Sequence, residues 1–543
     1  MRVYYNALVR TMDPATPVAE AFAVDSGEFV AIGGNDDVLN LAQGSRGAQK
    51  IDLGGLPVFP GFIDGHTHVM WVGESLERVD LSKCRSIEEV RSRLRERAAE
   101  LGPGQWVLGW GWHQERFAER RDPVAADIDG VIPGNPAYLI RECTHTALVN
   151  SLALEMAGVG ANTPDPVGGK IVRDDSGVPV GLLHETAMQL VSRILPAPDE
   201  RAKRETLKRA MLEMLKLGIT SVHTIDFSCE EAYRSLHTGG ELPLRVYMDQ
   251  PMSTMEEISA ITEPTGSGDD WLRMGSVKFW ADGAFGPRTA AVREPYADDP
   301  GNTGLLVYEP GELARLAAAA ARKGRQISIH ALGDRALDVT LDALEQATTA
   351  PGEPVTAGSA RGGRRDRVVH CGLTDAASVA RMKSLGAVAD LQPCFIPHEV
   401  HWMPGRVGPE RRDRMYAFKS LVDAGICCTA GSDAPVDPLD PMIGIFGAVA
   451  RASIEGYPPG GWVPGQKVPV EEAVRMYTVN GAFAEYAEAR KGMIRRGYLA
   501  DFVVLSSDLF TVAEGDIPGC RVLATVVGGG TAWLDGKAAP ALR

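Results

Sequence analysis

The sequence lacks the features that mark membrane, secreted or nucleic-acid-binding proteins. No apolar run is long enough to cross a bilayer. The first residues, MRVYYNALVR, lack the long apolar core of a signal peptide. The formal net charge of −15 would repel a nucleic-acid backbone. We therefore expect a cytoplasmic protein with no nucleic-acid and no membrane partner.

Paired cysteines are also missing. The chain has 8 cysteines, none of them in a C-x-x-C arrangement, and the adjacent Cys427 and Cys428 fit a buried strand. This distribution predicts free thiols in a reducing compartment rather than a disulfide framework. The hydrophobic content of 44% and charged content of 23% are typical of a globular protein.

After residue 58, short apolar runs alternate with amphipathic segments. The runs predict eight strands, at 58–64, 218–226, 244–249, 276–282, 326–330, 367–370, 387–391 and 426–433. Their nearly continuous apolar character is typical of strands buried on both faces. Helices are predicted at 200–217, 311–324, 334–348, 375–385 and 412–424. The alternation predicts an α/β fold, a (β/α)8 TIM barrel, with a doubly wound open sheet as the alternative.

Two regions interrupt this alternation. About 150 residues separate the first two strands, far more than a normal connecting loop. That stretch has its own predicted helix at 86–100, strands at 106–112 and 137–141 and a hairpin at 170–183, so we expect an inserted subdomain at about 72–200. Residues 1–57 and 492–543 show short strands with glycine turns, and we expect them to form one composite β domain beside a barrel at 58–491.

Polar residues capable of binding metal occur where the predicted barrel strands end. His66 and His68 follow the first strand, and their side chains share one side if the strand continues through Thr67. Further candidates are Lys278 in the fourth strand, His330 and His370 at the ends of the fifth and sixth, and Asp433 at the end of the eighth. A lone H-x-H pair is a weak signal, but the chain has only 11 histidines. Barrels of this kind carry catalytic groups at strand C-termini, so the pattern predicts a metal site.

Five motifs carry a family resemblance. They are GFIDGHTH (61–68), VKFWADGAFGPRTA (277–290), SIHALGDRA (328–336), VVHCG (368–372) and AGSDAP (430–435). Together they resemble the amidohydrolase superfamily, most of all its branch containing N-substituted formamide deformylases and many uncharacterised metal-dependent hydrolases. The resemblance implies a distorted (β/α)8 barrel with a small β-sandwich from both termini. It also implies the metal ligands His66, His68, Lys278, His330, His370 and Asp433.

The implied chemistry is hydrolysis. A divalent metal lowers the pKa of bound water toward ~7, and imidazole and carboxylate ligands suit Zn2+. Asp433 would bind the metal, accept the proton of the attacking water and return it to the leaving amine. A charged Lys278 would repel the metal. The resemblance favours a carboxylated Lys278 that bridges two metal ions, and one metal with a neutral or more distant Lys278 is the alternative.

Other residues are expected around this centre. The candidate substrate contacts are Trp112, His113, His145, Glu185 and Arg288, and the candidate supports behind the ligands are Asp64 and Asp282. Each has an ordinary alternative. Trp112 would pack between insertion and barrel, and Glu185 would begin a helix. Arg288 would pair with Asp282 or Glu294, and Asp64 would hold a local turn.

The leading hypothesis is hydrolysis of a C–N bond in a small amide, formamide or cyclic amide by metal-activated hydroxide. One alternative is a heterocycle deaminase of the same superfamily. Such deaminases typically carry Glu three residues after the fifth-strand His, whereas this chain has Gly333 there, followed by Asp334. A non-catalytic binding protein is the other alternative. We expect a small-molecule substrate, and a homodimer is left open.

Overall fold

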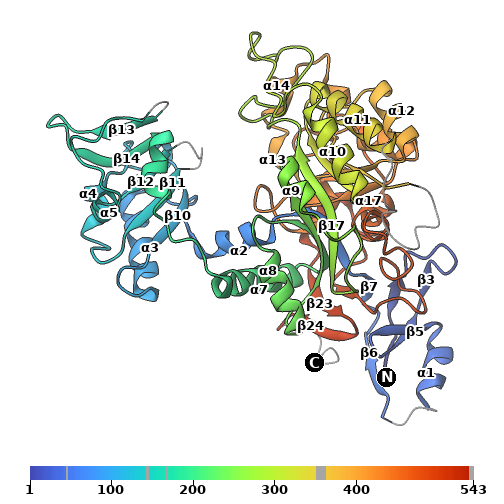
Figure 1. The fold of residues 1–543 in the computed structure, drawn as a ribbon. Helices are drawn as coiled ribbons and strands as arrows, with labels where there is room; N and C mark the ends of the chain where they lie inside the picture. The colour runs from blue at the N-terminus through green and yellow to red at the C-terminus, as the bar shows by residue number, and fades with distance from the viewer. Residues whose placement is uncertain (44–46, 142–145, 167–168, 350–362, 537–543) are drawn as a thin grey trace. The chain divides into compact units, whose positions relative to one another are not determined.

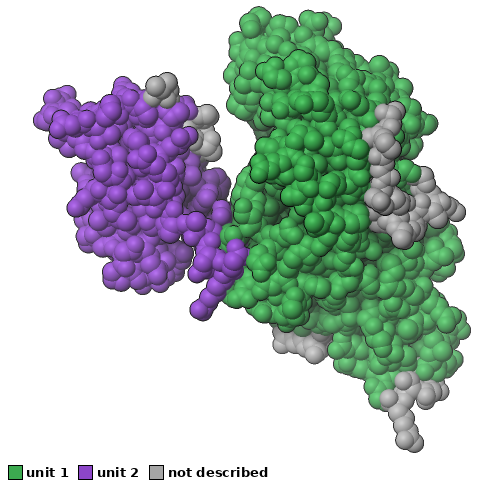
Figure 2. All heavy atoms as spheres, viewed as in Figure 1, with its two compact units in different colours: residues 1–72, 203–543 green, residues 73–202 purple. Residues whose placement is uncertain are grey.

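The computed structural model describes residues 1–43, 47–141, 146–166, 169–349 and 363–536. The chain forms two compact units, one of residues 1–72 and 203–543 and the other of residues 73–202 (Figure 2). Among the described residues, no helix has the length and apolar character needed to cross a membrane.

An eight-stranded parallel sheet forms the centre of the larger unit. Its strands follow chain order: β8 (Phe62–Thr67), β15 (Ile219–Ile225), β16 (Arg245–Pro251), β17 (Leu272–Trp280), β18 (Ile327–Ala331), β19 (Arg367–His370), β20 (Val388–Leu391) and β21 (Cys428–Ala430). Asp433 N–H donates to the His66 carbonyl at 2.7 Å, which brings the first and last strands together. The sheet is therefore a nearly closed barrel. The predicted barrel is confirmed, and the doubly wound sheet, whose strand order would reverse, is excluded.

Helices follow the strands along the chain (Figure 1). They are α2 (Val69–Glu77), α7 (Glu200–Lys216), α8 (Glu230–Thr238), α9 (Met255–Ser259), α10 (Glu312–Arg322), α11 (Asp334–Thr349), α12 (Ala376–Leu385), α13 (Phe395–Glu399), α14 (Met403–Val407), α15 (Phe418–Asp423), α16 (Pro441–Ala450), α17 (Val470–Met476) and α18 (Val479–Ala484). Small side chains let α10 approach closely, since Ala317–Ala321 are all buried. The predicted helix at 412–424 is wrong in one respect. Tyr416, within this segment, has φ 47°, so only α15 and a short 3-10 turn form.

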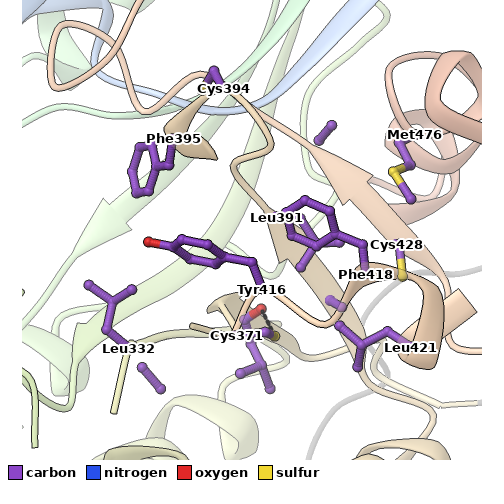
Figure 3. Close-up of a cluster of buried hydrophobic side chains, with 14 of the residues drawn as sticks. Leu332, Cys371, Leu391, Cys394, Phe395, Tyr416, Phe418, Leu421, Cys428 and Met476 are labelled. Carbon is purple, nitrogen blue, oxygen red and sulfur yellow. Dashed lines mark hydrogen bonds between the residues drawn. The ribbon is translucent and has the colours of Figure 1, made fainter. Parts of the chain in front are cut away.

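Part of the apolar core lies beside the last three barrel strands (Figure 3). Tyr416 lies between Phe395 and Phe418, with ring centroids 6.3 and 6.1 Å away. Cys371, Cys394 and Cys428 are in the same apolar cluster. The segment carrying α13 is thereby fixed close to the C-terminal ends of β19 to β21.

The strands from the two ends of the chain share a sheet. Its order is β24 (Gly530–Leu534), β23 (Val522–Val527), β22 (Phe502–Leu505), β7 (Pro57–Pro60), β2 (Leu8–Arg10) and β3 (Val18–Ala19). A second sheet has the order β5 (Glu28–Gly33), β4 (Ala21–Asp25), β1 (Arg2–Tyr5) and β6 (Gln49–Asp52), and α1 (Asn35–Gln43) follows β5. On this pairing we propose residues 1–57 and 492–543 as one β domain.

Gly61 divides the strand predicted at 58–64. Residues up to Pro60 pair with β22, whereas residues from Phe62 pair with β15 of the barrel. A Cβ at Gly61 would lie 2.2 Å from Thr220 Oγ1, so only glycine fits where the chain passes from one sheet to the other. The sequence showed one continuous apolar run because both strands are buried.

The unit of residues 73–202 has a core of its own. Its sheet has the order β13 (Gly169–Arg173), β14 (Pro179–Glu185), β12 (Thr146–Val149), β11 (Ala137–Arg141), β10 (Val107–Trp112) and β9 (Val79–Asp80). The helices are α3 (Ile87–Glu100), α4 (Ala125–Asp129), α5 (Ser151–Met156) and α6 (Gln189–Ser192). Ser86 caps α3 by accepting from Glu89 N–H, a favoured arrangement at helix starts.

We expect Gly61→Ala to destabilise the protein by about 1–3 kcal/mol, because the added methyl overlaps Thr220 in a fully packed position. Thermal unfolding followed by circular dichroism measures the change. Gly33→Ala is the matched control, since nothing lies within 4 Å of its added Cβ. Equal unfolding temperatures for the two variants would contradict this account of residue 61.

Candidate metal centre

Three of the predicted ligands meet where β8 and β21 adjoin. The Asp433 carboxylate Oδ1 lies 3.2 Å from His68 Nε2 and 3.5 Å from His66 Nε2. One ligand atom from each of these residues lies within 4.8 Å of the others. All three side chains are buried, so the group is a compact donor set inside the protein.

The remaining three predicted ligands extend this group across the barrel. Lys278 Nζ lies 3.4 Å from His66 Nε2. The His370 ring is 5.6 Å from the His66 ring, and the His330 ring is 4.5 Å from the His370 ring. Side chains from five strands that are distant in sequence thus form one continuous cluster.

Each histidine ring also has an oxygen neighbour at one nitrogen, through a hydrogen bond in His68, His370 and His330 and through an ion-pair contact in His66. The contacts are His68 Nδ1 to Ile225 O at 2.7 Å, His370 Nδ1 to Gln392 Oε1 at 2.6 Å, His330 Nε2 to Gly283 O at 2.9 Å and His66 Nδ1 to Asp390 Oδ2 at 3.4 Å. Metal-binding histidines commonly have such partners, which set the tautomer and leave the other nitrogen for the metal.

The electrostatics of the cluster suit a divalent cation. Burial lowers the pKa of His370 to about 3, and burial with the nearby Lys278 charge lowers the pKa of His66 well below its ordinary value. Burial alone would raise the pKa of Asp433, but the His68 hydrogen bond and the neighbouring imidazoles hold it below its usual range. Burial alone would lower the pKa of His68, but the Asp433 carboxylate raises it. The neutral imidazoles of His66 and His370 beside an ionised carboxylate are donors that Zn2+ and similar ions prefer. The residues therefore fit a metal ion.

Backbone strain marks two of the predicted ligands. His370 has φ 71° and Asp433 has φ 56°, both in the left-handed region that non-glycine residues seldom occupy. Such conformations persist where the surroundings impose them, and they gather at functional sites. His370 ends β19 and Asp433 lies three residues beyond β21, and at both positions the side chain reaches the cluster.

Lys278 is an inward-facing residue between two outward ones. Val277 and Phe279 pack in the apolar core, whereas Lys278 is only 1% exposed. Burial lowers the pKa of Lys278 to about 8, despite the opposing charges of Asp433 and Asp390.

Comparisons with known proteins agree with this arrangement. Residues 49–532 match the model of the amidohydrolase family. The chain belongs to the amidohydrolase family. The Bacillus subtilis protein YtcJ is 33% identical over 97% of this chain and 98% of its own length. The N-substituted formamide deformylase of Arthrobacter pascens is 30% identical over 96% of both chains. An uncharacterized metal-dependent hydrolase from Pyrococcus horikoshii has a solved structure with TM-score 0.79 and 28% identity, covering 95% of this chain and 99% of that one. The protein is thus an enzyme of the hydrolase class.

The two residues predicted to support the ligands have different contacts in this amidohydrolase. Asp282 accepts from Leu332 and Gly333 N–H and lies 3.4 Å from His330 Nε2. Asp64 instead accepts from His66 N–H and from the N–H and hydroxyl of Ser432. Asp64 therefore links the end of β8 to the segment after β21. Its hydrogen bond to His66 N–H is also the local turn role that the sequence left open. Burial raises its pKa to about 7.

The substrate contacts predicted in the insertion belong to the unit of residues 73–202. Trp112 is 0% exposed and its indole N–H donates to Leu139 O at 3.0 Å, which favours a packing role inside that unit. His113 Nε2 lies 3.5 Å from Arg141, and Glu185 ends β14 with φ 52°. His145 lies outside the described residues. Substrate binding by these four residues stays a prediction.

Arg288 has a different partner from those considered in the sequence. Its guanidinium makes two hydrogen bonds to Asp298, of 3.1 and 2.9 Å, so pairing with Asp282 or Glu294 is wrong. Asp298 lies only ten residues away, in a connection whose course the sequence pattern did not reveal.

The position expected to carry a deaminase glutamate is sterically closed. A Cβ at Gly333 would lie 1.8 Å from the Ala291 carbonyl oxygen. The following residue, Asp334, accepts from Arg293 N–H at 2.8 Å, and its other oxygen lies 3.7 Å from Arg414. The geometry therefore counts against a heterocycle deaminase.

Sequence reasoning missed Asp390, Gln392 and Arg367. Asp390 on β20 contacts His66, and Arg367 Nη2 donates to Asp390 at 2.5 Å. Gln392 contacts His370. The available signal was one acidic residue in the otherwise apolar run AVADL at 387–391.

We expect Asp390→Asn to weaken metal binding by about 10- to 100-fold, because His66 loses its charged partner. Metal retained against a competing chelator is the measurement. Asp366→Asn is the control, since Asp366 is equally a buried, arginine-bound carboxylate but contacts Arg364 and Ile327. Equal metal retention in both variants would rule out this role for Asp390.

Proposed function

We propose that the protein hydrolyses a C–N bond in a small amide, formamide or cyclic amide. The observation that carries the proposal is the Asp433 carboxylate, held within 3.5 Å of two imidazoles in the buried cluster. The named relative from Arthrobacter pascens, an N-substituted formamide deformylase, supports a C–N bond as the target.

The proposed metal is Zn2+, as one or two ions. The residues that would hold it are His66, His68, Lys278, His330, His370 and Asp433. When bound, such an ion lowers the pKa of water and polarises a carbonyl oxygen.

Asp433 is the proposed proton carrier. Its ionised carboxylate accepts one proton from the attacking water, and the water oxygen forms a bond to the carbonyl carbon. The C–N bond then breaks, and the nitrogen takes the proton from Asp433 as it leaves. The products are a carboxylic acid and an amine, so one water molecule is consumed for each bond cleaved. Asp64, behind the turn, keeps His66 and Ser432 at a fixed separation during these steps.

We expect Asp433→Asn to lower kcat/KM by about 10²–10⁴-fold without unfolding the protein, because proton transfer is lost. The assay is a panel of formamides, N-acyl amines, cyclic amides and esters, with metal content measured on the same samples. Asp508→Asn is the control, since Asp508 pairs with Arg10 outside the cluster. Wild-type protein that holds metal and cleaves none of the C–N compounds would refute the proposal.

Removal of metal by a chelator should abolish activity, and return of the metal should restore it.

We also propose that the neutral Lys278 amine adds CO2 and loses one proton to form an anionic carbamate, whose oxygens would help to hold two ions. The burial of its amine and the 3.4 Å distance from Nζ to His66 Nε2 support this, since a cationic ammonium there would oppose metal binding.

Labelled bicarbonate tests the carbamate. We expect a carbamate carbon signal in ¹³C NMR of the wild type that is absent from Lys278→Met. Lys491→Met is the matched control, because Lys491 is also buried but lies 2.5 Å from Glu485 Oε1. A signal that persists in Lys278→Met, or its absence from metal-loaded wild type, would favour the single-metal alternative.

The proposed location is the cytoplasm. The seven described cysteines are free, which suits a reducing compartment. A small-molecule substrate follows from the proposed reaction, and a homodimer stays a prediction.

A further inference from the structure

Three aromatic side chains form a continuous stack that begins at a predicted metal ligand. The Trp71 ring lies 4.3 Å from the His68 ring at an interplanar angle of 26°. Phe227 follows at 6.3 Å and 22°, and Trp280 follows at 5.8 Å and 14°. These separations and near-parallel planes are those of offset-stacked rings.

The three rings come from separate barrel segments that end at the same edge of the sheet. Trp71 is in α2 just after β8, Phe227 lies two residues beyond β15, and Trp280 is the last residue of β17. Trp280 is on the same face of β17 as Lys278, because side chains two residues apart share a face. Phe227 lies two residues after Ile225, whose carbonyl contacts His68. The stack therefore adjoins the cluster.

Core packing does not account for the stack. Phe227 is 51% exposed and Trp71 is 40% exposed, so these side chains are not part of the buried core. Aromatic residues make up only 6% of the chain, yet three of them gather here. Exposed apolar side chains that gather beside a polar site are typical of ligand-binding surfaces.

We propose that Trp71, Phe227 and Trp280 form a subsite that binds a flat apolar group of the substrate, an aryl substituent. The inference rests on the proposed function, since it assumes that the reacting bond lies at the cluster of predicted metal ligands, which includes His68. A planar substituent on that substrate would stack on rings that are already parallel, so little side-chain ordering is needed on binding. The subsite would thus select amides by their substituent rather than by the bond that breaks.

Phe227 is the residue to change, because its stacking partners are Trp71 and Trp280 rather than a predicted ligand. The substrates are the N-benzyl and N-methyl forms of formamide and of acetamide. For wild type we expect a higher kcat/KM with the benzyl form. For Phe227→Leu that preference should fall about tenfold, because the π face is lost while an apolar side chain remains. Phe227→Tyr should keep the preference, and metal content should be unchanged in both.

Phe510→Leu is the matched control, since Phe510 packs edge-on against Phe59 at 5.3 Å, away from the cluster. An unchanged benzyl preference in Phe227→Leu, or an equal loss in Phe510→Leu, would overturn the subsite. If none of the four amides is cleaved, the proposed function fails for them, and calorimetric binding of N-benzylacetamide then decides the subsite separately. Binding that is about tenfold weaker in Phe227→Leu than in wild type supports it, and equal or undetectable binding overturns it.

Discussion

The buried ion pair between Arg367 and Asp390 is the interaction on which the barrel interior depends. Arg367 is 0% exposed, and it also lies 3.4 Å from Asp249 and donates to the Gly65 carbonyl. Burial would lower its pKa, but the two carboxylates raise it, so the charge is retained. Burying charges is costly, and loss of one partner of such a pair typically destabilises a protein by about 3–5 kcal/mol. The same carboxylate reaches His66, so the site rests directly on this pair.

The barrel gives opposite environments to adjacent residues, and this allows a polar cluster inside an apolar protein. On β17, Val277 and Phe279 face the covering helices, while Lys278 faces the cluster. Ring nitrogens that do not face the centre meet carbonyl, amide or carboxylate oxygens. The positions of these side chains are therefore set by the residues that surround the cluster.

The proposed reaction centre and the proposed substituent subsite involve different residues of this unit. Bond cleavage is assigned to the buried cluster around Asp433, and selection of the substituent to the exposed rings of Trp71 and Phe227. Gly333 leaves no room for a catalytic side chain at its position, since a side chain there would collide with the Ala291 carbonyl. A change of aromatic residues could thus alter substrate preference while leaving the chemistry intact, as expected when loops on a rigid barrel carry specificity.

The sequence by itself determined the parallel barrel and pointed to six polar residues at its strand ends, because strand periodicity and strand C-termini are local features. Within residues 73–202 it indicated α3, β10, β11 and the hairpin of β13 and β14, but it missed β9, β12 and the helices α4, α5 and α6. Only the tertiary structure showed the break at Gly61, the Asp298 partner of Arg288, and the contact of Asp390 with His66. These depend on contacts between residues distant along the chain, which no local pattern encodes. The aromatic stack was also visible only in the tertiary structure, since its rings lie on three separate segments and meet only when the barrel closes.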